Sequence, residues 1–307
     1  MKRQLVIKQG ALGDMVLATG AFQAIRAHHA DDHLVLLTTS AYEGFARASG
    51  YFDEIWIDPR PPLWRVWQWL ALGRRLRGGG FERAYDLQHT TRTGMYFRLF
   101  GTARPEWSGI AAGCSHPHAN PERNRMHTVE REAEQLAMAG IKQTPPPDLS
   151  WLSSDISALD LSTPYALLVP GGSAHRPEKR WPAARYGRAA AALEALGLRP
   201  VLIGAEAERA GMADITAACP RAIDLCGKTD FGAIAACARG ARLAIGNDTG
   251  PMHIIATAGC ASLVLFSAAS QPALSAPRGP DVSVLQRDSL ADLEVDEVMA
   301  ALTLPQP

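Results

Sequence analysis

Three stretches of this 307-residue chain combine glycines with side chains that could carry chemistry, and the first lies near the N-terminus. It reads Lys8-Gln-Gly-Ala-Leu-Gly-Asp14, and its glycines allow the backbone to approach a ligand closely. Asp14 falls where a helix is expected to begin. It could serve as the N-cap of that helix, or as a base that takes a proton from a hydroxyl nucleophile. The loop lacks the GxGxxG spacing of dinucleotide-binding enzymes, which argues against a dehydrogenase.

The second stretch is Pro170-Gly171-Gly172-Ser173, followed by Lys179-Arg180-Trp181-Pro182. Backbone amides of Gly172 and the hydroxyl of Ser173 could contact phosphate oxygens, and Lys179 and Arg180 add positive charge nearby. A flexible loop with a solvated basic pair is the alternative interpretation. The position directly after an expected strand favours phosphate contact.

The strongest signal is Gly246-Asn-Asp-Thr-Gly-Pro-Met-His253, between an apolar strand pattern and an apolar helix pattern. Gly250-Pro251 predicts a helix start, whose free N–H groups would suit a diphosphate. Asp248 and Thr249 are expected to cap this helix, and His253 falls in its first turn. A histidine in an apolar helix is more often structural, but here the strand, the polar loop and the helix start coincide, so we expect ligand contact.

Other candidates are weaker. Glu206 follows an expected strand and could accept hydrogen bonds from a ribose or a base. Alternatively, it caps a helix or lies on its surface without a role in binding. The segment from Arg60 to Arg131 holds twelve arginines, no lysine and five acids, a net charge of +7. Arginine matches phosphate and carboxylate geometry, so Arg92, Arg123 and Arg125 are candidates for gripping an anionic acceptor. The Trp-rich helix expected over residues 63–77 could lie at a membrane surface, although packing against the core is the commoner role of such residues.

Composition excludes several classes of protein. The net charge is zero, so the chain as a whole does not look like a nucleic-acid-binding protein. With 47% hydrophobic and 20% charged residues, it is neither disordered nor a disulfide scaffold. Its five cysteines lack metal-ligand spacing, so we expect buried thiols and no metal. No apolar run approaches the ~20 residues that span a bilayer, and no signal-peptide pattern opens the chain, so we expect a cytoplasmic protein.

Strand-like and helix-like segments alternate, which predicts an α/β fold with parallel sheets. Strands are expected at 5–8, 34–38, 55–58, 84–88, 165–169, 200–203, 222–225, 243–245, 262–266 and 282–286. Helices are expected at 14–28, 42–49, 63–77, 183–196, 207–218, 231–238, 252–258 and 292–302. Prolines 145–147 mark a linker, which divides the chain into two Rossmann-like domains, 1–155 and 156–307, with a cleft between them. Whether the last helix crosses back to the first domain is left open.

In their order and spacing, four motifs resemble glycosyltransferase family 9, the ADP-heptose:lipopolysaccharide heptosyltransferases. The motifs are Gly13-Asp14, Lys179-Arg180-Trp181-Pro182, Gly204-Ala205-Glu206, and Asp248-Thr249-Gly250 with His253. The resemblance implies a GT-B architecture, with an acceptor domain followed by a nucleotide-sugar domain. It also implies an inverting, metal-independent transfer, without a cofactor, of a heptose from an ADP-sugar to an anionic lipopolysaccharide inner-core sugar.

The same resemblance implies roles for individual residues. Asp14 would be the general base and Lys179 would neutralise the leaving diphosphate, while Gly13 would lie with the acceptor. Donor contacts would come from Gly172, Ser173, Arg180, Glu206, Thr229, Asp248, Thr249, Gly250 and His253. Ser173 stands where better-known members often carry a threonine. Thr229 stands where a larger adenine-facing residue is expected.

Two other functions remain open at this stage. A nucleotide-sugar epimerase or hydrolase of the same architecture would need no acceptor, which would leave the basic segment without a purpose. A non-catalytic nucleotide-sugar-binding protein would need no base. Peripheral contact with the inner face of the inner membrane is a further expectation.

Overall fold

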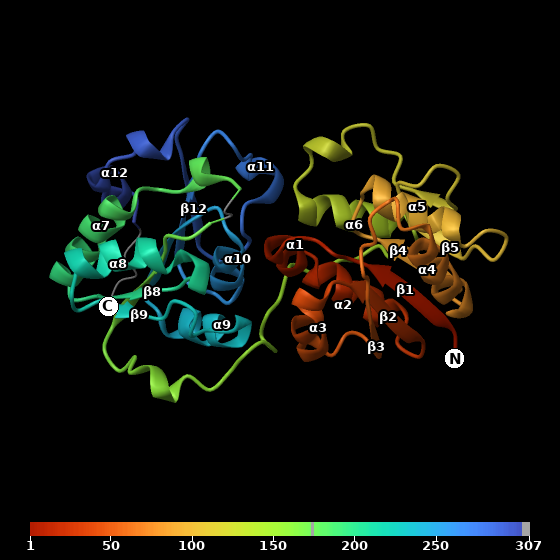
Figure 1. Cartoon of the computed structure of the whole chain (residues 1–307), viewed down its shortest axis with the longest axis horizontal. Coiled ribbons are helices and arrows are strands. Elements are labelled where there is room, and N and C mark those ends of the chain that lie inside the picture. The colour runs from red at the N-terminus through yellow and green to blue at the C-terminus, as the bar shows by residue number, and fades with distance from the viewer. Residues whose placement is uncertain (173–174, 303–307) are drawn as a thin grey trace. The chain divides into compact units, whose positions relative to one another are not determined.

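The chain forms two compact units, which the computed structural model divides between Pro147 and Asp148. The structure describes residues 1–172 and 175–302 (Figure 1). Segment 148–154 packs with the second unit: Arg239 donates to the carbonyls of Leu149 and Leu152, and the Ser154 hydroxyl donates to Asp230. The division therefore falls at the end of the proline cluster.

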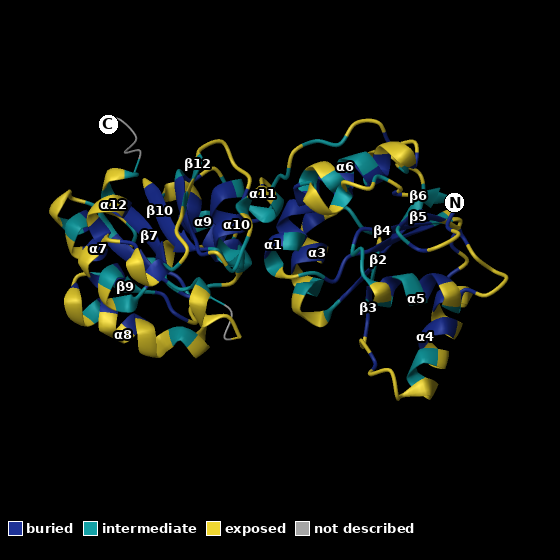
Figure 2. Cartoon of the chain, turned by 90° about the horizontal axis from the view of Figure 1, so that it is seen from above, coloured by how far each residue is buried: buried dark blue, intermediate teal, exposed yellow. Residues whose placement is uncertain are grey.

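The first unit is built on a six-stranded parallel sheet in the order β3-β2-β1-β4-β5-β6. The strands are β1 Arg3–Ile7, β2 His33–Thr38, β3 Glu54–Ile57, β4 Arg83–Asp86, β5 Glu106–Gly109 and β6 His116–Pro117. Central strands such as β1 and β2 are almost completely buried, since helices cover both faces of a parallel sheet (Figure 2). This strand order is that of a Rossmann fold.

Helices of the first unit are α1 Leu12–Leu17, α2 Thr19–His28, α3 Glu43–Ser49, α4 Val66–Gly78, α5 Thr91–Leu99 and α6 Thr128–Met138. The prediction of a single helix over 14–28 is wrong, because the helix is interrupted at Ala18. There the Thr19 hydroxyl donates to the Val16 carbonyl at 2.7 Å, a local bond that competes with the helical pattern. The helix expected from residue 63 begins only at Val66.

The second unit repeats the same topology, with the sheet order β12-β11-β10-β7-β8-β9. Its strands are β7 Tyr165–Val169, β8 Arg199–Leu202, β9 Ile223–Asp224, β10 Leu243–Asn247, β11 Ser262–Phe266 and β12 Val282–Gln286. All neighbouring pairs are parallel. Both units thus have the Rossmann order, as the alternating pattern predicts.

Helices of the second unit are α7 Ala183–Ala195, α8 Arg209–Ala218, α9 Phe231–Gly240, α10 Gly250–Thr257, α11 Pro272–Ser275 and α12 Val295–Ala300. The last of these packs against α7 (Figure 1). Val295 and Val298 join the core cluster that contains Leu193. The described part of the C-terminal segment therefore completes the second unit.

Each sheet has one point where successive crossovers leave in opposite directions. It lies between β1 and β4 in the first unit and between β7 and β10 in the second. Ligands of such folds bind beyond the carboxyl ends of the strands at this point. The loops after these four strands and the first turns of the helices that follow hold Asp14, residues 87–92, Gly172 and Asp248. The fold therefore brings most of the chemistry-bearing segments to two sheet edges.

Candidate functional site

In the first unit, a buried ion pair joins the loops that follow β1 and β4. Lys8 Nζ donates to Glu132 Oε1 of α6 at 2.6 Å and to the Leu87 carbonyl at 3.0 Å. Both charged side chains are almost fully buried. Burial raises the pKa of Glu132, and the positive charge of Lys8 opposes that rise. Lys8 therefore ties the end of β1, from which the Asp14 loop continues, to the β4 loop and to α6.

Asp14 lies in the third position of α1, half-buried, rather than at the N-cap, which is Ala11. Its Oδ2 accepts a hydrogen bond from the Ala11 N–H at 3.2 Å. A Cβ on Gly10 would come within 2.6 Å of the Asp14 Cβ, so the glycine makes room for this side chain. Within the residues that the structure describes, Oδ1 makes no hydrogen bond. The carboxylate can therefore cap the helix with one oxygen and offer the other to a substrate.

The β4 loop adds two buried titratable groups. Asp86 Oδ1 accepts from the N–H groups of Gln88 and His89 at 3.1 and 3.4 Å, and its complete burial raises its pKa to about 6. His89 has a left-handed backbone (φ 54°), and its Nε2 contacts Gln135 of α6. Burial lowers the pKa of His89 to about 3. The imidazole is therefore neutral at physiological pH.

The three arginines expected to bind an acceptor lie on two separate elements. Arg92, on α5, donates through both terminal nitrogens to the Pro61 carbonyl, at 3.1 and 2.8 Å. Arg123 and Arg125 share a one-turn 3-10 helix, in which Arg125 pairs with Glu122 at 2.8 Å. Arg92 is thus already engaged in holding a turn, whereas Arg123 and Arg125 stand close to solvent.

In the second unit, the side chain of Asn247 ties the switch point together. This residue ends β10 and is completely buried. Its Oδ1 accepts from the Trp181 N–H at 3.0 Å and from the Tyr186 hydroxyl at 3.1 Å. Its Nδ2 donates to the carbonyls of Pro170 and Gly171 at 2.8 and 3.0 Å. One carboxamide thus fixes the loop after β7 and the start of α7 relative to β10.

This arrangement brings together two residues singled out from the sequence. Lys179 Nζ lies 2.7 Å from Asp248 Oδ2, and the Ser270 hydroxyl donates to the same oxygen at 2.6 Å. Both charged side chains are largely buried. A lysine held here can neutralise an anion that arrives at the carboxyl edge of the sheet.

The expected capping of α10 is wrong. Thr249 occupies the N-cap position, but its side chain makes no hydrogen bond to the helix, and the Asp248 carboxylate bonds to Lys179 and Ser270 instead. The helix begins at Gly250, with Pro251 in its first turn and His253 buried one turn in. Among the described residues no side chain caps the N-terminal end of α10, which suits a bound anion.

Glu208, which the sequence analysis missed, organises the loop at Gly172. Its two carboxylate oxygens accept from the N–H groups of Gly172 at 2.6 Å and Ala205 at 2.8 Å. Arg180 donates to the Gly172 carbonyl at 2.6 Å. The Gly172 amide is thus engaged inside the protein. Ser173 lies outside the described residues. The signal for Glu208 was a glutamate three residues after Ala205, the spacing of a capping box.

Glu206 is exposed and pairs with Arg209, which lowers its pKa. It lies beside the loop that follows β9, because a Cβ on Gly227 (φ 71°) would come within 2.5 Å of Glu206 Oε2. Thr229, half-buried, is two residues further along this loop. These two predicted donor contacts therefore come from neighbouring loops at the carboxyl edge of the second sheet.

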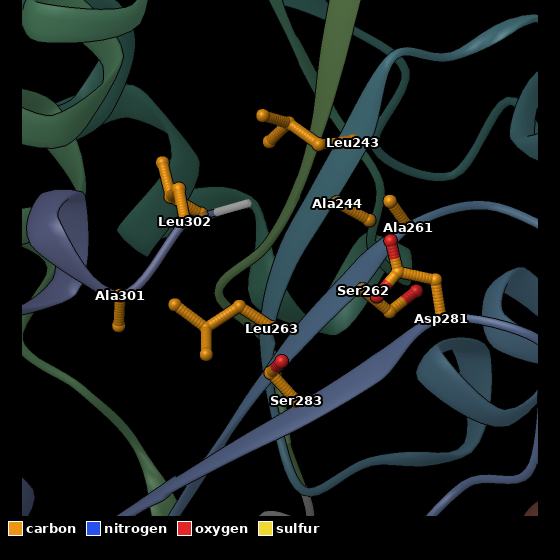
Figure 3. Close-up of a pocket in the computed structure, with 9 residues that line it drawn as sticks. All are labelled: Leu243, Ala244, Ala261, Ser262, Leu263, Asp281, Ser283, Ala301 and Leu302. Carbon is orange, nitrogen blue, oxygen red and sulfur yellow. The ribbon is translucent and has the colours of Figure 1, made fainter. Parts of the chain in front are cut away.

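Two pockets of the second unit differ in their relation to these loops. One is lined by the first residues of β10 and β11 with Asp281 and Leu302 (Figure 3), so it lies at the amino edge of the sheet, opposite the loops described above. The other, of about 300 Å³, is lined by Gly171, Arg180, Trp181 and Glu208 among others. Only the second adjoins the candidate site.

Two findings concern metals and membranes. Among the described residues, no group of three or more histidine, cysteine, aspartate or glutamate side chains is arranged to hold a metal ion. All five cysteines are buried free thiols, as expected. None of the described helices has both the length and the apolar character needed to cross a bilayer.

Residues 69–297 match the model of glycosyltransferase family 9 (heptosyltransferase). The structure of E. coli ADP-heptose lps heptosyltransferase II is similar with a TM-score of 0.76 and 21% identity, over 98% of this chain and 97% of that chain. The structure of a family 9 glycosyltransferase from Veillonella parvula has a TM-score of 0.83 and 19% sequence identity, over 98% of this chain and 95% of that chain. The structure of E. coli heptosyltransferase WaaC with ADP has a TM-score of 0.74 and 17% sequence identity, over 97% of this chain and 98% of that chain.

No curated protein sequence matches the chain. The structural likenesses confirm the expected fold class, an α/β protein of GT-B type with two Rossmann-like domains.

The buried Asp86 predicts an unusual pH dependence of stability. Its pKa rises from 3.8 when exposed to about 6 when folded, so its burial destabilises the protein increasingly as pH rises between these values. Asp86→Asn keeps the accepting oxygen and removes the charge. We expect it to raise the free energy of unfolding by about 2–3 kcal/mol at neutral pH and by nothing below pH ~4, measured by urea unfolding.

Asp31→Asn is the matched control, because Asp31 is exposed, and it should change stability at neither pH. An equal change from Asp86→Asn at both pH values would contradict the explanation by burial.

Proposed function

The chain belongs to glycosyltransferase family 9, and from this we propose that it transfers a heptose from an ADP-sugar to an anionic sugar of the lipopolysaccharide inner core. The pairing of Lys179 with Asp248 at the uncapped start of α10 carries this proposal. The loops of the second unit would hold the donor, and those of the first unit, with Asp14, the acceptor. We place the reaction in the cytoplasm, at the inner face of the inner membrane.

The donor assignment has chemical support. A departing diphosphate gains negative charge, and Lys179, Arg180 and the N–H groups at the start of α10 supply positive charge near this edge. Glu206 and Thr229 would face the nucleoside, and Asp248, Thr249, Gly250 and His253 the sugar-diphosphate. Two similar solved structures contain ADP or an ADP-heptose analogue. Lys179 must leave Asp248, in whole or in part, to meet the diphosphate.

Asp14 would act on the acceptor. The acceptor hydroxyl attacks the anomeric carbon of the heptose from the face opposite the diphosphate, and its proton passes to Asp14. The bond from the anomeric carbon to the phosphate oxygen breaks, and its electron pair leaves with ADP, so the configuration inverts. Lysine and helix amides can stabilise the leaving group in this scheme without a metal ion. Arg123 and Arg125 would meet acceptor phosphates or carboxylates.

Donor identity can be tested by calorimetry with ADP-heptose, UDP-GlcNAc and GDP-mannose, without divalent metal. We expect selective binding of the ADP-sugar and a loss of about tenfold or more in affinity for Lys179→Met, since a charge-assisted contact is removed. The exposed Lys142→Met is the matched control and should bind normally. Preference for another nucleotide-sugar would overturn the assignment of ADP-heptose as donor, but the proposed phosphate-binding site would still stand.

Asp14→Asn separates the two interpretations of Asp14, because asparagine can still accept from the Ala11 N–H but cannot take a proton. We expect transfer to fall about 10²- to 10⁴-fold, with donor affinity and unfolding free energy unchanged. Asp31→Asn serves as the control. Full turnover by Asp14→Asn would leave Asp14 as a cap only.

The same assay separates the alternatives. A hydrolase or epimerase would consume the donor without an acceptor, and a binding protein would consume none. The family membership of the chain favours the transferase.

A further inference from the structure

Large apolar side chains are exposed together in one short segment of the first unit. Leu63, Trp64, Val66, Trp67 and Leu70 are 58–69% exposed, and they are five of the nine exposed large hydrophobic residues described. The segment comprises the turn before α4 and the first half of that helix, and Figure 2 shows it exposed at the tip of the unit. We call residues 63–70 the α4 tip.

Helix α4 has apolar side chains on two faces. Leu72 and Leu76 are buried in the core of the unit. Val66, Trp67 and Leu70 lie three and four positions apart, the spacing of one helix face, and this face is open to solvent. A surface helix normally presents polar residues there, and exposed apolar clusters mark interaction sites. The core packing of the tryptophans expected from the sequence does not hold for Trp64 and Trp67.

The sequence around the α4 tip carries only positive charge. Residues 59–81 contain five arginines and no acidic residue. Arg75 and Arg77 donate to the carbonyls of Ile57 and Leu99, within the unit. Arg65 lies over the Trp64 ring at 4.8 Å, and Arg74 forms no ion pair within the described residues. Arg65 and Arg74 are therefore free to meet anions beside the exposed tryptophans.

The α4 tip is held in place from below. The Trp69 indole N–H donates to the Pro62 carbonyl at 3.1 Å, and its ring packs against Tyr96 and under Arg92. Arg92 in turn holds the Pro61 carbonyl. The exposed side chains therefore project from a turn that internal hydrogen bonds fix, which lowers the cost of inserting them elsewhere.

We propose that the α4 tip docks on an anionic phospholipid surface, with Trp64 and Trp67 at the level of the headgroups and Arg65 and Arg74 on the phosphates. Tryptophan beside arginine suits this interface, where one end of the side chain is apolar and the other is wet. A second copy of the chain fits poorly, because it would bring two positive segments together. The inference rests on the proposed function in one respect, that the acceptor carries lipid.

The test is co-sedimentation of the full chain with vesicles of equal parts phosphatidylglycerol and phosphatidylcholine, and with vesicles of phosphatidylcholine alone. We expect binding to the anionic vesicles, weakened by salt. Trp64→Ser with Trp67→Ser should lower that affinity about tenfold or more, because two large apolar groups no longer insert. Arg65→Gln with Arg74→Gln should remove most of the salt dependence.

Leu196→Ser is the matched control, an equally exposed apolar residue of the second unit, and should bind like the wild type. Since all the altered side chains are exposed, the variants should unfold at the wild-type midpoint. Equal binding by the double tryptophan variant, or equal binding of the wild type to neutral vesicles, would overturn the proposal. So would a tryptophan-dependent dimer in light scattering without vesicle binding.

Transfer to a lipid-free core oligosaccharide keeps the two proposals separate. The double tryptophan variant should retain that activity and lose activity toward acceptor embedded in anionic vesicles. If the wild type transfers to neither acceptor, the proposed function fails, whereas the vesicle-binding result still decides whether the α4 tip docks.

Discussion

The side chain of Asn247 is the interaction on which the second unit depends. It is completely buried at the switch point. Its Oδ1 accepts hydrogen bonds from Trp181 and Tyr186, before and in α7, and its Nδ2 donates to the two carbonyls that follow β7. An apolar replacement would leave these backbone groups buried without partners, which costs about 1–3 kcal/mol each. Because Trp181 follows Lys179 by two residues, the same hydrogen bonds set where Lys179 meets Asp248.

In the first unit, buried charged side chains rather than a carboxamide hold the loops at the carboxyl edge of the sheet. Lys8 and Glu132 form a buried pair, and Asp86 is buried at the end of the neighbouring strand β4. Buried charges are costly, so they are poor evidence for stability. Because Lys8 directly follows β1 and is bonded to Glu132 and to the Leu87 carbonyl, the pair anchors the start of the loop that leads to Asp14. A base must be held at hydrogen-bond distance from its proton donor, which a mobile loop would not achieve.

Much of the fold could be predicted from the sequence, for a physical reason. Strands β7, β11 and β12 have the expected bounds. Each is a short run rich in apolar, strand-forming residues, and turn-forming or polar residues bound it. Strands β5 and β6 were missed, since they are short and mix polar with apolar residues. The partners of Lys8 and Gly172 were also missed, because these contacts join residues 124 and 36 positions apart, and only the folded chain brings them together.

The most direct test of the account is product analysis by NMR, with ADP-heptose, a lipid-free inner-core oligosaccharide and a chelator present. The account predicts one ADP released for each new glycosidic bond, with the anomeric configuration inverted and no donor consumed when the acceptor is omitted. Free heptose formed without acceptor, or a glycoside with retained configuration, would contradict it.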